Sequence, residues 1–132
     1  MIKQAWKYVK TLQDSEAIEK FESKNGIQLP SDLKCIIKKF NGGRPPVKYY
    51  DTDTETGKEF KTLLSFNQSD IETIYKCFPL PSGDKSLIPF ASDPSGDLFV
   101  IKDGKIGLWN HEKDTVTLLA NTFTEFLLNL HA

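Results

Sequence analysis

The segment that most restricts the fold runs from Ile88 to Glu112 and reads IPFASDPSGDLFVIKDGKIGLWNHE. Two turn sequences, Asp-Pro-Ser-Gly-Asp and Asp-Gly, separate three apolar runs within it. An Asp-Gly pair between apolar runs is a strong signal for a tight hairpin, because both residues tolerate a positive φ. The segment therefore predicts three consecutive antiparallel strands, at about 87–91, 98–101 and 106–110.

The rest of the chain alternates between helical and extended patterns. Apolar residues spaced three and four apart, after capping residues, predict helices over about 14–24, 31–40, 70–77 and 122–130. Alternating patterns predict strands at 47–50, 60–66 and 116–120, the first two forming a hairpin with a long tip. This order indicates an α+β fold in a single domain over residues 1–132. We expect a twisted, mainly antiparallel sheet of five or six strands, with helices packed mainly on one face.

Composition places the chain among ordinary globular proteins, with 39% hydrophobic and 27% charged residues. No apolar run approaches the roughly 20 residues that cross a bilayer. The start, MIKQAWKYVK, lacks the apolar stretch of a signal peptide. We therefore expect a cytoplasmic protein without membrane contact. Cys35 and Cys77 fall in predicted helices outside any CxxC pair, which is typical of small buried side chains and not of disulfides or metal ligands.

The charge is nearly balanced overall but unevenly distributed along the chain. Residues 1–66 hold 12 basic and 9 acidic side chains (+3), and residues 67–132 hold 5 and 9 (−4), which gives the net charge of −1. Arg44 is the only arginine, although arginine is the favoured residue for contacts with phosphates and bases. A direct nucleic-acid partner is therefore not expected.

Four titratable residues invite a catalytic or cation-binding interpretation: Asp93, Asp97, His111 and Glu112. Asp93 and Asp97 flank a Pro-Ser-Gly sequence, which is typical of a turn and lacks the spaced ligands of a calcium loop. His111 and Glu112 are adjacent, and adjacent residues on a strand point to opposite faces. The simpler interpretation is a pair of turns, with His111 exposed in one of them. We expect no catalytic residue, no metal and no cofactor; a small hydrolase built on these four residues is the least favoured alternative.

Two further loops carry charge or glycine. Asn41-Gly42-Gly43-Arg44 follows a predicted helix, so a helix stop is favoured over a small anion-binding nest. The segment DTDTETGKE, residues 51–59, is acidic and turn-rich. A solvated hairpin tip is the simpler interpretation of this run. The alternative is an acidic surface that attracts a basic protein partner, because loops on a rigid sheet often carry binding.

Several motifs in a fixed order resemble a known family. They are LPSDLKCIIKKFNGG, then LIPFASDPSGDLFVI, GKIGLWNHE and the closing NTFTEFLLNL. Together they resemble the Smi/Knr-type branch of the SUKH superfamily, from about Glu16 to Leu130. The segment from Val47 to Pro81 matches this pattern least well.

The resemblance implies an α+β binding fold without a catalytic motif. It also implies an immunity protein that binds and neutralises a cognate secreted polymorphic toxin, often a nuclease or deaminase, by direct contact. A regulatory or scaffold module that binds a cellular protein is the alternative, since fold alone does not settle function. We expect a monomer or weak homodimer. The candidate residues for contact with a nuclease toxin are the acidic loop residues Asp51, Asp53, Glu55, Glu59, Asp93, Asp97 and Glu112.

Overall fold

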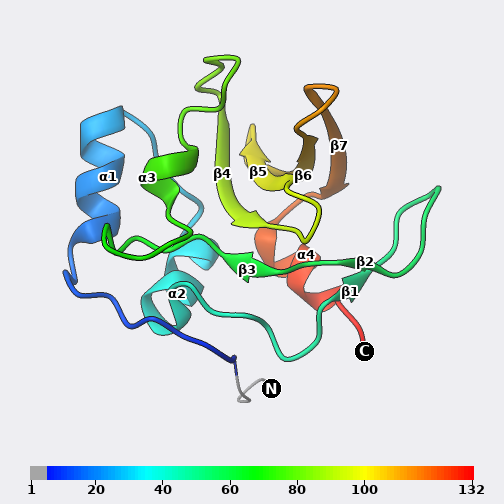
Figure 1. The fold of residues 1–132 in the computed structure, drawn as a ribbon, viewed down its shortest axis with the longest axis horizontal. Coiled ribbons are helices and arrows are strands. Elements are labelled where there is room, and N and C mark those ends of the chain that lie inside the picture. Colours follow the sequence, from blue (N-terminus) through cyan, green and yellow to red (C-terminus); the bar gives the residue numbers. More distant parts are fainter. Residues whose placement is uncertain (1–5) are drawn as a thin grey trace.

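The computed structural model describes residues 6–132 and shows an α+β fold, as predicted (Figure 1). The elements follow one another in the order α1 Ala17–Asn25, α2 Ser31–Phe40, β1 Tyr49–Tyr50, β2 Lys58–Glu59, β3 Thr62–Leu63, α3 Ile74–Cys77, β4 Leu87–Ser92, β5 Leu98–Lys102, β6 Lys105–Asn110, β7 Thr115–Ala120 and α4 Phe123–Leu128.

The main sheet has five strands in the order β3-β4-β5-β6-β7, and every neighbouring pair is antiparallel. The three strands predicted from Ile88–Glu112 are confirmed as β4, β5 and β6. The turn between β5 and β6 consists of Asp103 and Gly104, with φ of 51° and 78°, as a tight hairpin requires. This turn sets the register that pairs Leu98 with Trp109. The predicted hairpin between 47–50 and 60–66 is wrong: β1 pairs with β2 at 58–59 in a separate two-stranded hairpin, and β3 pairs with β4.

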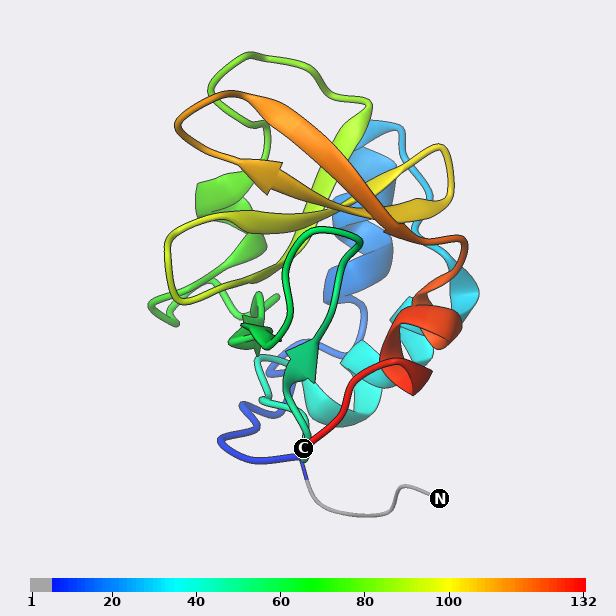
Figure 2. The same cartoon turned by 90° about the vertical axis from the view of Figure 1, so that its right-hand side faces the viewer.

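The main core lies between the sheet and the helices. Figure 2 shows the sheet above and in front, with the helices behind and below it. Phe99 is central to this core, and its ring centroid lies 4.9 Å from that of Phe60 and 5.5 Å from that of Phe126. Such aromatic pairs stabilise a core beyond the area that they bury. The helices therefore pack mainly on one face of the sheet, as predicted.

The opposite face of the sheet carries a smaller apolar cluster. Leu80, Leu87, Val100 and Trp109 are buried there, and Leu98 and Val116 pack against them from the sheet. No helix belongs to this cluster among residues 6–132; Leu80 comes from the loop between α3 and β4. Trp109 is 5% exposed in this cluster.

Two predicted boundaries are wrong in the middle of the chain. The helix predicted over 70–77 begins only at Ile74, capped by the Thr73 side chain, because Thr73 itself is extended and pairs with Ser65. The backbone N–H of Ser65 donates to Glu72 O at 2.9 Å. The strand predicted over 60–66 is a ladder only at Thr62–Leu63, although the residues around it are buried on both sides.

The helices also correct one expectation about the cysteines. Both lie in helices and are free thiols, but Cys35 is exposed on α2, and only Cys77 is partly buried. Burial raises the pKa of the Cys77 thiol. Among residues 6–132, no helix is long and apolar enough to cross a bilayer.

Candidate functional site

The turn between β4 and β5 uses the carboxylate of Asp93 for its own structure. Asp93 is 7% exposed. Its Oδ1 accepts hydrogen bonds from the Ser95 backbone N–H (2.9 Å), the Ser95 hydroxyl (2.8 Å) and the Asp97 N–H (2.9 Å). Gly96 completes the turn with φ of 96°, a value that few other residues adopt. The carboxylate is thus a turn former that faces inward.

Asp97 joins the ends of two strands. Its Oδ1 accepts the His111 backbone N–H at 3.1 Å and lies 2.6 Å from His111 Nδ1. The β5–β6 register places them together, because Leu98, the residue after Asp97, pairs with Trp109, two residues before His111. The His111 ring lies over Gly96, where an added Cβ would be 3.5 Å from Cε1. Sequence reasoning missed this pair, although the Asp-Gly turn fixes the register that creates it.

The turn from β6 to β7 is ordered by side-chain caps. Asn110 Oδ1 accepts the backbone N–H groups of Glu112 and Lys113, each at 2.9 Å. Asp114, with φ of 54°, accepts the Trp109 indole N–H at 2.7 Å. Glu112 itself is exposed at this turn. Its carboxylate takes part in no hydrogen bond or ion pair among the described residues, so it is available to a partner.

The side chains of the four candidate catalytic residues do not converge on one point. Asp97 and His111 form a pair, but Asp93 bonds to its own turn. A base and its orienting carboxylate need a nucleophile or a bound water in line with the imidazole. Among residues 6–132, the only side chain that bonds the His111 ring is Asp97. In the same residues, no group of three or more His, Cys, Asp and Glu side chains is placed to hold a metal ion.

The β1–β2 hairpin projects from the body of the molecule, with residues 51–57 at its tip (Figure 1). Asp51 stabilises the tip, because its Oδ1 accepts the Gly57 N–H at 2.8 Å. Its Oδ2 lies 3.2 Å from Nε2 of His131. The hydrogen bond from Gly57, followed by the interaction with His131, lowers the pKa of Asp51.

The other acidic residues of the hairpin differ in whether their carboxylates already form ion pairs within the chain. Glu55 pairs with Lys58 at 3.1 Å, and Glu59 pairs with Lys48 at 3.2 Å. Asp53 is exposed and has no ion pair among the described residues. Two of the four carboxylates in the loop thus pair with a lysine of the same chain, which reduces the net negative field of this surface.

The hairpin is fastened to the body at its base. Tyr49 and His131 exchange two backbone hydrogen bonds, of 3.0 and 2.8 Å, so the end of the chain is paired at His131. Tyr50 is 2% exposed and contacts Phe99 and Phe126 edge-on. Burial, then the negative charges of Asp93 and Asp97, raises the pKa of its hydroxyl above the usual range. The chain leaving the hairpin lies close to the 93–97 turn, because the backbone N–H of Lys61 donates to Ser92 O at 2.9 Å.

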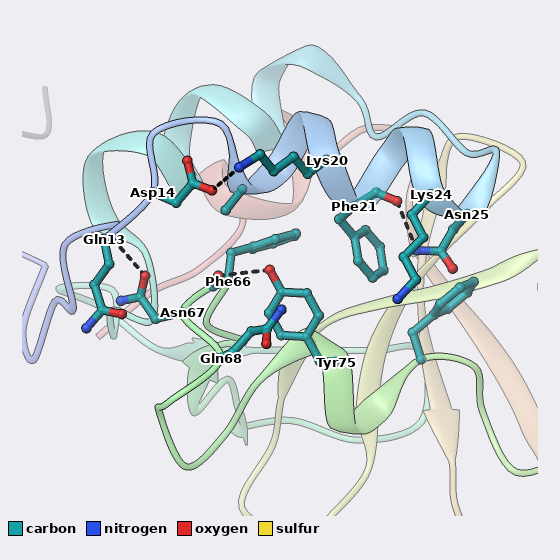
Figure 3. A pocket seen from close by; sticks show the side chains of 12 residues that line it. Gln13, Asp14, Lys20, Phe21, Lys24, Asn25, Phe66, Asn67, Gln68 and Tyr75 are labelled. Atoms are coloured by element: carbon teal, nitrogen blue, oxygen red, sulfur yellow. Dashed lines mark hydrogen bonds and ion pairs between the residues drawn. The ribbon is translucent and has the colours of Figure 1, made fainter.

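A groove of about 410 Å³ lies between α1 and the segment 66–78 (Figure 3). Its floor consists of aromatic side chains that belong to the core, among them Phe21, Phe66 and Tyr75. Its rim is polar, and there Lys20 bonds to Asp14 at 2.8 Å. The sequence indicated no site here, because these apolar residues follow the spacing of an ordinary buried helix face. The groove is therefore a depression over the core with a polar edge.

Comparison with known proteins identifies a family and a curated relative. The sequence model of the SMI1/KNR4 family (SUKH-1) matches residues 14–129. A curated relative is the SPbeta prophage-derived uncharacterized protein YokK of Bacillus subtilis (strain 168), 28% identical over 151 aligned positions. The alignment covers 91% of this chain and 76% of the relative. No solved structure matches the chain.

Proposed function

We propose that this chain, which belongs to the SMI1/KNR4 family (SUKH-1), is an immunity protein that binds a cognate toxin and neutralises it by direct contact. The family match over residues 14–129 carries the proposal, because it covers nearly the whole fold. A relative that is prophage-derived also supports the proposal, because immunity genes are expected on mobile elements.

The acidic loops of the molecule form the contact surface that we propose. The β1–β2 hairpin projects its tip into solvent, while Tyr50 fixes its base in the core (Figure 1). An arm held in this way enters a partner's cleft with little loss of conformational entropy. A nuclease toxin has a basic substrate groove, and carboxylates on such an arm would take the place of phosphates there.

The structure ranks the candidate carboxylates within this proposal. Asp53 and Glu112 are exposed and have no internal ion pair among residues 6–132, so they are assigned the leading contacts. Asp51, Glu55 and Glu59 are exposed or half-exposed; Glu55 and Glu59 would each exchange an internal lysine for a cation on the toxin, and Asp51 would exchange its contact with His131. Asp93 and Asp97 are buried. Their part in binding would be to hold the turns in shape.

Co-expression with the toxin domains encoded beside the gene tests the function. Survival of cells that produce both proteins is the expected result, and death of cells that produce the wild-type chain with each of these toxins would refute the immunity function.

The double variant Asp53→Lys, Glu112→Lys tests whether the acidic surface binds the toxin. We expect this double variant to reduce protection, and Glu16→Lys to leave it intact. Glu16 is an exposed carboxylate at the start of α1 (Figure 1).

Salt dependence provides a second test of the surface. Association steered by exposed charges slows as salt is added, because the Debye length shrinks from about 10 Å at 0.1 M to about 3 Å at 1 M. We expect the wild-type association rate to fall with salt and that of the Asp53→Lys, Glu112→Lys variant to fall less. Equal protection and equal salt dependence in the two proteins would show that another surface binds the toxin.

A further inference from the structure

The two edges of the main sheet differ in how they are protected. Strand β3 is two residues long, and its outer side is covered, because the Leu63 N–H donates to Gly43 O at 3.0 Å. The Thr62 hydroxyl donates to Gly42 O at 2.9 Å and closes the same edge. A short, covered edge strand is a common protection against pairing with another chain.

The opposite edge, strand β7, has none of this protection. It is six residues long, Thr115–Ala120, and its sequence TVTLLA contains no charged residue and no proline. Among residues 6–132, β6 is the only strand that pairs with it. Figure 2 shows β7 as the outermost strand at the front of the sheet. Its outward N–H and C=O groups are therefore open to another strand, which charges or proline usually prevent in a monomeric protein.

An apolar surface continues to this edge from the face of the sheet that carries no helices. Val116 packs against the cluster that contains Trp109 and Val100. Leu118, on the same face of β7, is 56% exposed. It lies over Gly107, where an added Cβ would be 3.7 Å from Leu118 Cδ2. A bulge at the end of β7 follows Leu118, so the regular part of the strand is Thr115–Leu118.

We propose that a second copy of this chain pairs with β7 along its free edge, so that two five-stranded sheets form one continuous sheet. A two-fold axis would bring Val116 and Leu118 of both copies together and extend the small apolar cluster across the interface. The strand is suited to pair with itself, because it has no like charges to repel one another. Both outer edges of the joined sheet would then be the covered β3, and no open edge would remain. This arrangement does not depend on the proposed toxin.

The mass of the purified chain in solution tests the pairing. We expect light scattering across a dilution series to give twice the 15.0 kDa of one chain at high concentration. Leu118→Lys and Thr117→Lys each place a charge on the edge and should give the monomer mass. Ile71→Lys is the matched control, because Ile71 is 84% exposed and lies between β3 and α3. It should remain dimeric.

Circular dichroism of each variant shows whether it is folded, and Thr117→Lys provides the decisive result if Leu118→Lys does not fold. The proposal is overturned if the wild-type chain stays at 15.0 kDa through the whole series. It is also overturned if folded edge variants remain dimeric. A chain that is monomeric alone but loses toxin protection with Leu118→Lys would show that a toxin strand, and not a second copy, occupies β7.

Discussion

At the scale of single residues, Asp97 shows how a buried carboxylate joins two strands of a sheet. One oxygen atom accepts from both the backbone and the ring of His111, so Asp97→Ala leaves the His111 backbone donor without its partner. We expect a loss of about 1–3 kcal/mol in the free energy of unfolding, the usual contribution of hydrogen bonds to a charged group. Urea denaturation measures this loss.

Asp53→Ala is the matched control for this change, because Asp53 is exposed and has no ion pair in the described chain. We expect it to stay within about 0.5 kcal/mol of wild type. Equal stability of the two variants would show that the Asp97–His111 contact contributes nothing to the fold.

The pair formed by Asp51 and His131 predicts a dependence on pH. The hydrogen bond with the Ala132 carbonyl, followed by the interaction with Asp51, raises the pKa of His131 from 6.5. The raised pKa of His131 stabilises the fold below pH 6.5, and this contribution disappears as pH rises through the folded value. The lowered pKa of Asp51 stabilises the fold above pH 3.8, and this is lost on acidification. The pair thus contributes mainly between these two values.

An NMR titration of the His131 ring tests this pair directly. We expect Asp51→Asn to lower the pKa of His131 only in part, since the hydrogen bond with Ala132 remains. Asp53→Asn should leave the titration unchanged. A His131 titration that is identical in wild type and Asp51→Asn would exclude the ion pair in solution.

At the scale of elements, strands β6 and β7 are held together by a close approach at Gly107. A Cβ added to Gly107 would lie 2.6 Å from Val116 Cγ1 and 3.2 Å from Thr117 O. We therefore expect Gly107→Ala to lower the free energy of unfolding by about 1–3 kcal/mol through overpacking. Thermal and urea unfolding measure the change.

A double variant separates the clash with Val116 from any other effect of replacing Gly107. Val116→Ala removes the nearest obstructing methyl group, so in its presence Gly107→Ala should cost less than in wild type. The contact with Thr117 O remains, and the rescue should be partial. Strictly additive effects of the two changes would show that Val116 is not the obstruction.

The elements also show which parts of the fold follow from local sequence. Strands β4 to β7 and helix α4 follow from it because their turns and caps are local; Thr122, for example, accepts the Glu125 N–H, as its capping motif predicts. The start of α3, in contrast, does not follow from the local sequence. The sequence Ser69-Asp70-Ile71-Glu72 predicts a capping box there, but Glu72 instead pairs with Lys61 at 3.3 Å, and Asp70 accepts from the Ser65 hydroxyl at 2.5 Å. A tertiary partner thus replaced the local one, and no local pattern specifies such a choice.

The candidate site was predictable to a similar extent. Its loops and exposed carboxylates follow from the sequence, whereas the burial of Asp93 and Asp97 does not, because their turn folds inward. The pairing of His131 with Tyr49 was likewise beyond local reasoning, since 82 residues separate the two in the chain. The sequence identifies which residues are charged; the tertiary structure decides which charges are already paired.

At the scale of the whole molecule, the fold combines a rigid sheet with a projecting arm. Strand β5 lies between β4 and β6, and its residues Phe99 and Val100 are fully buried on opposite faces. The β1–β2 hairpin lies outside this sheet and pairs over two residues per strand. Amides in central strands usually open only with global unfolding, whereas those in short peripheral ladders open locally.

Native-state hydrogen exchange should therefore separate two levels of stability. We expect the slowest exchange in β5, at Phe99 to Ile101, and the fastest in the hairpin tip, residues 52–56. Tyr50 should exchange more slowly than the tip, because its ring anchors the hairpin among Phe99 and Phe126. Replacing Phe99 by Leu removes part of this anchor and should speed exchange at Tyr50 more than at Trp109. Exchange at the tip as slow as in β5 would show that the hairpin is an integral part of the core and not a separate arm.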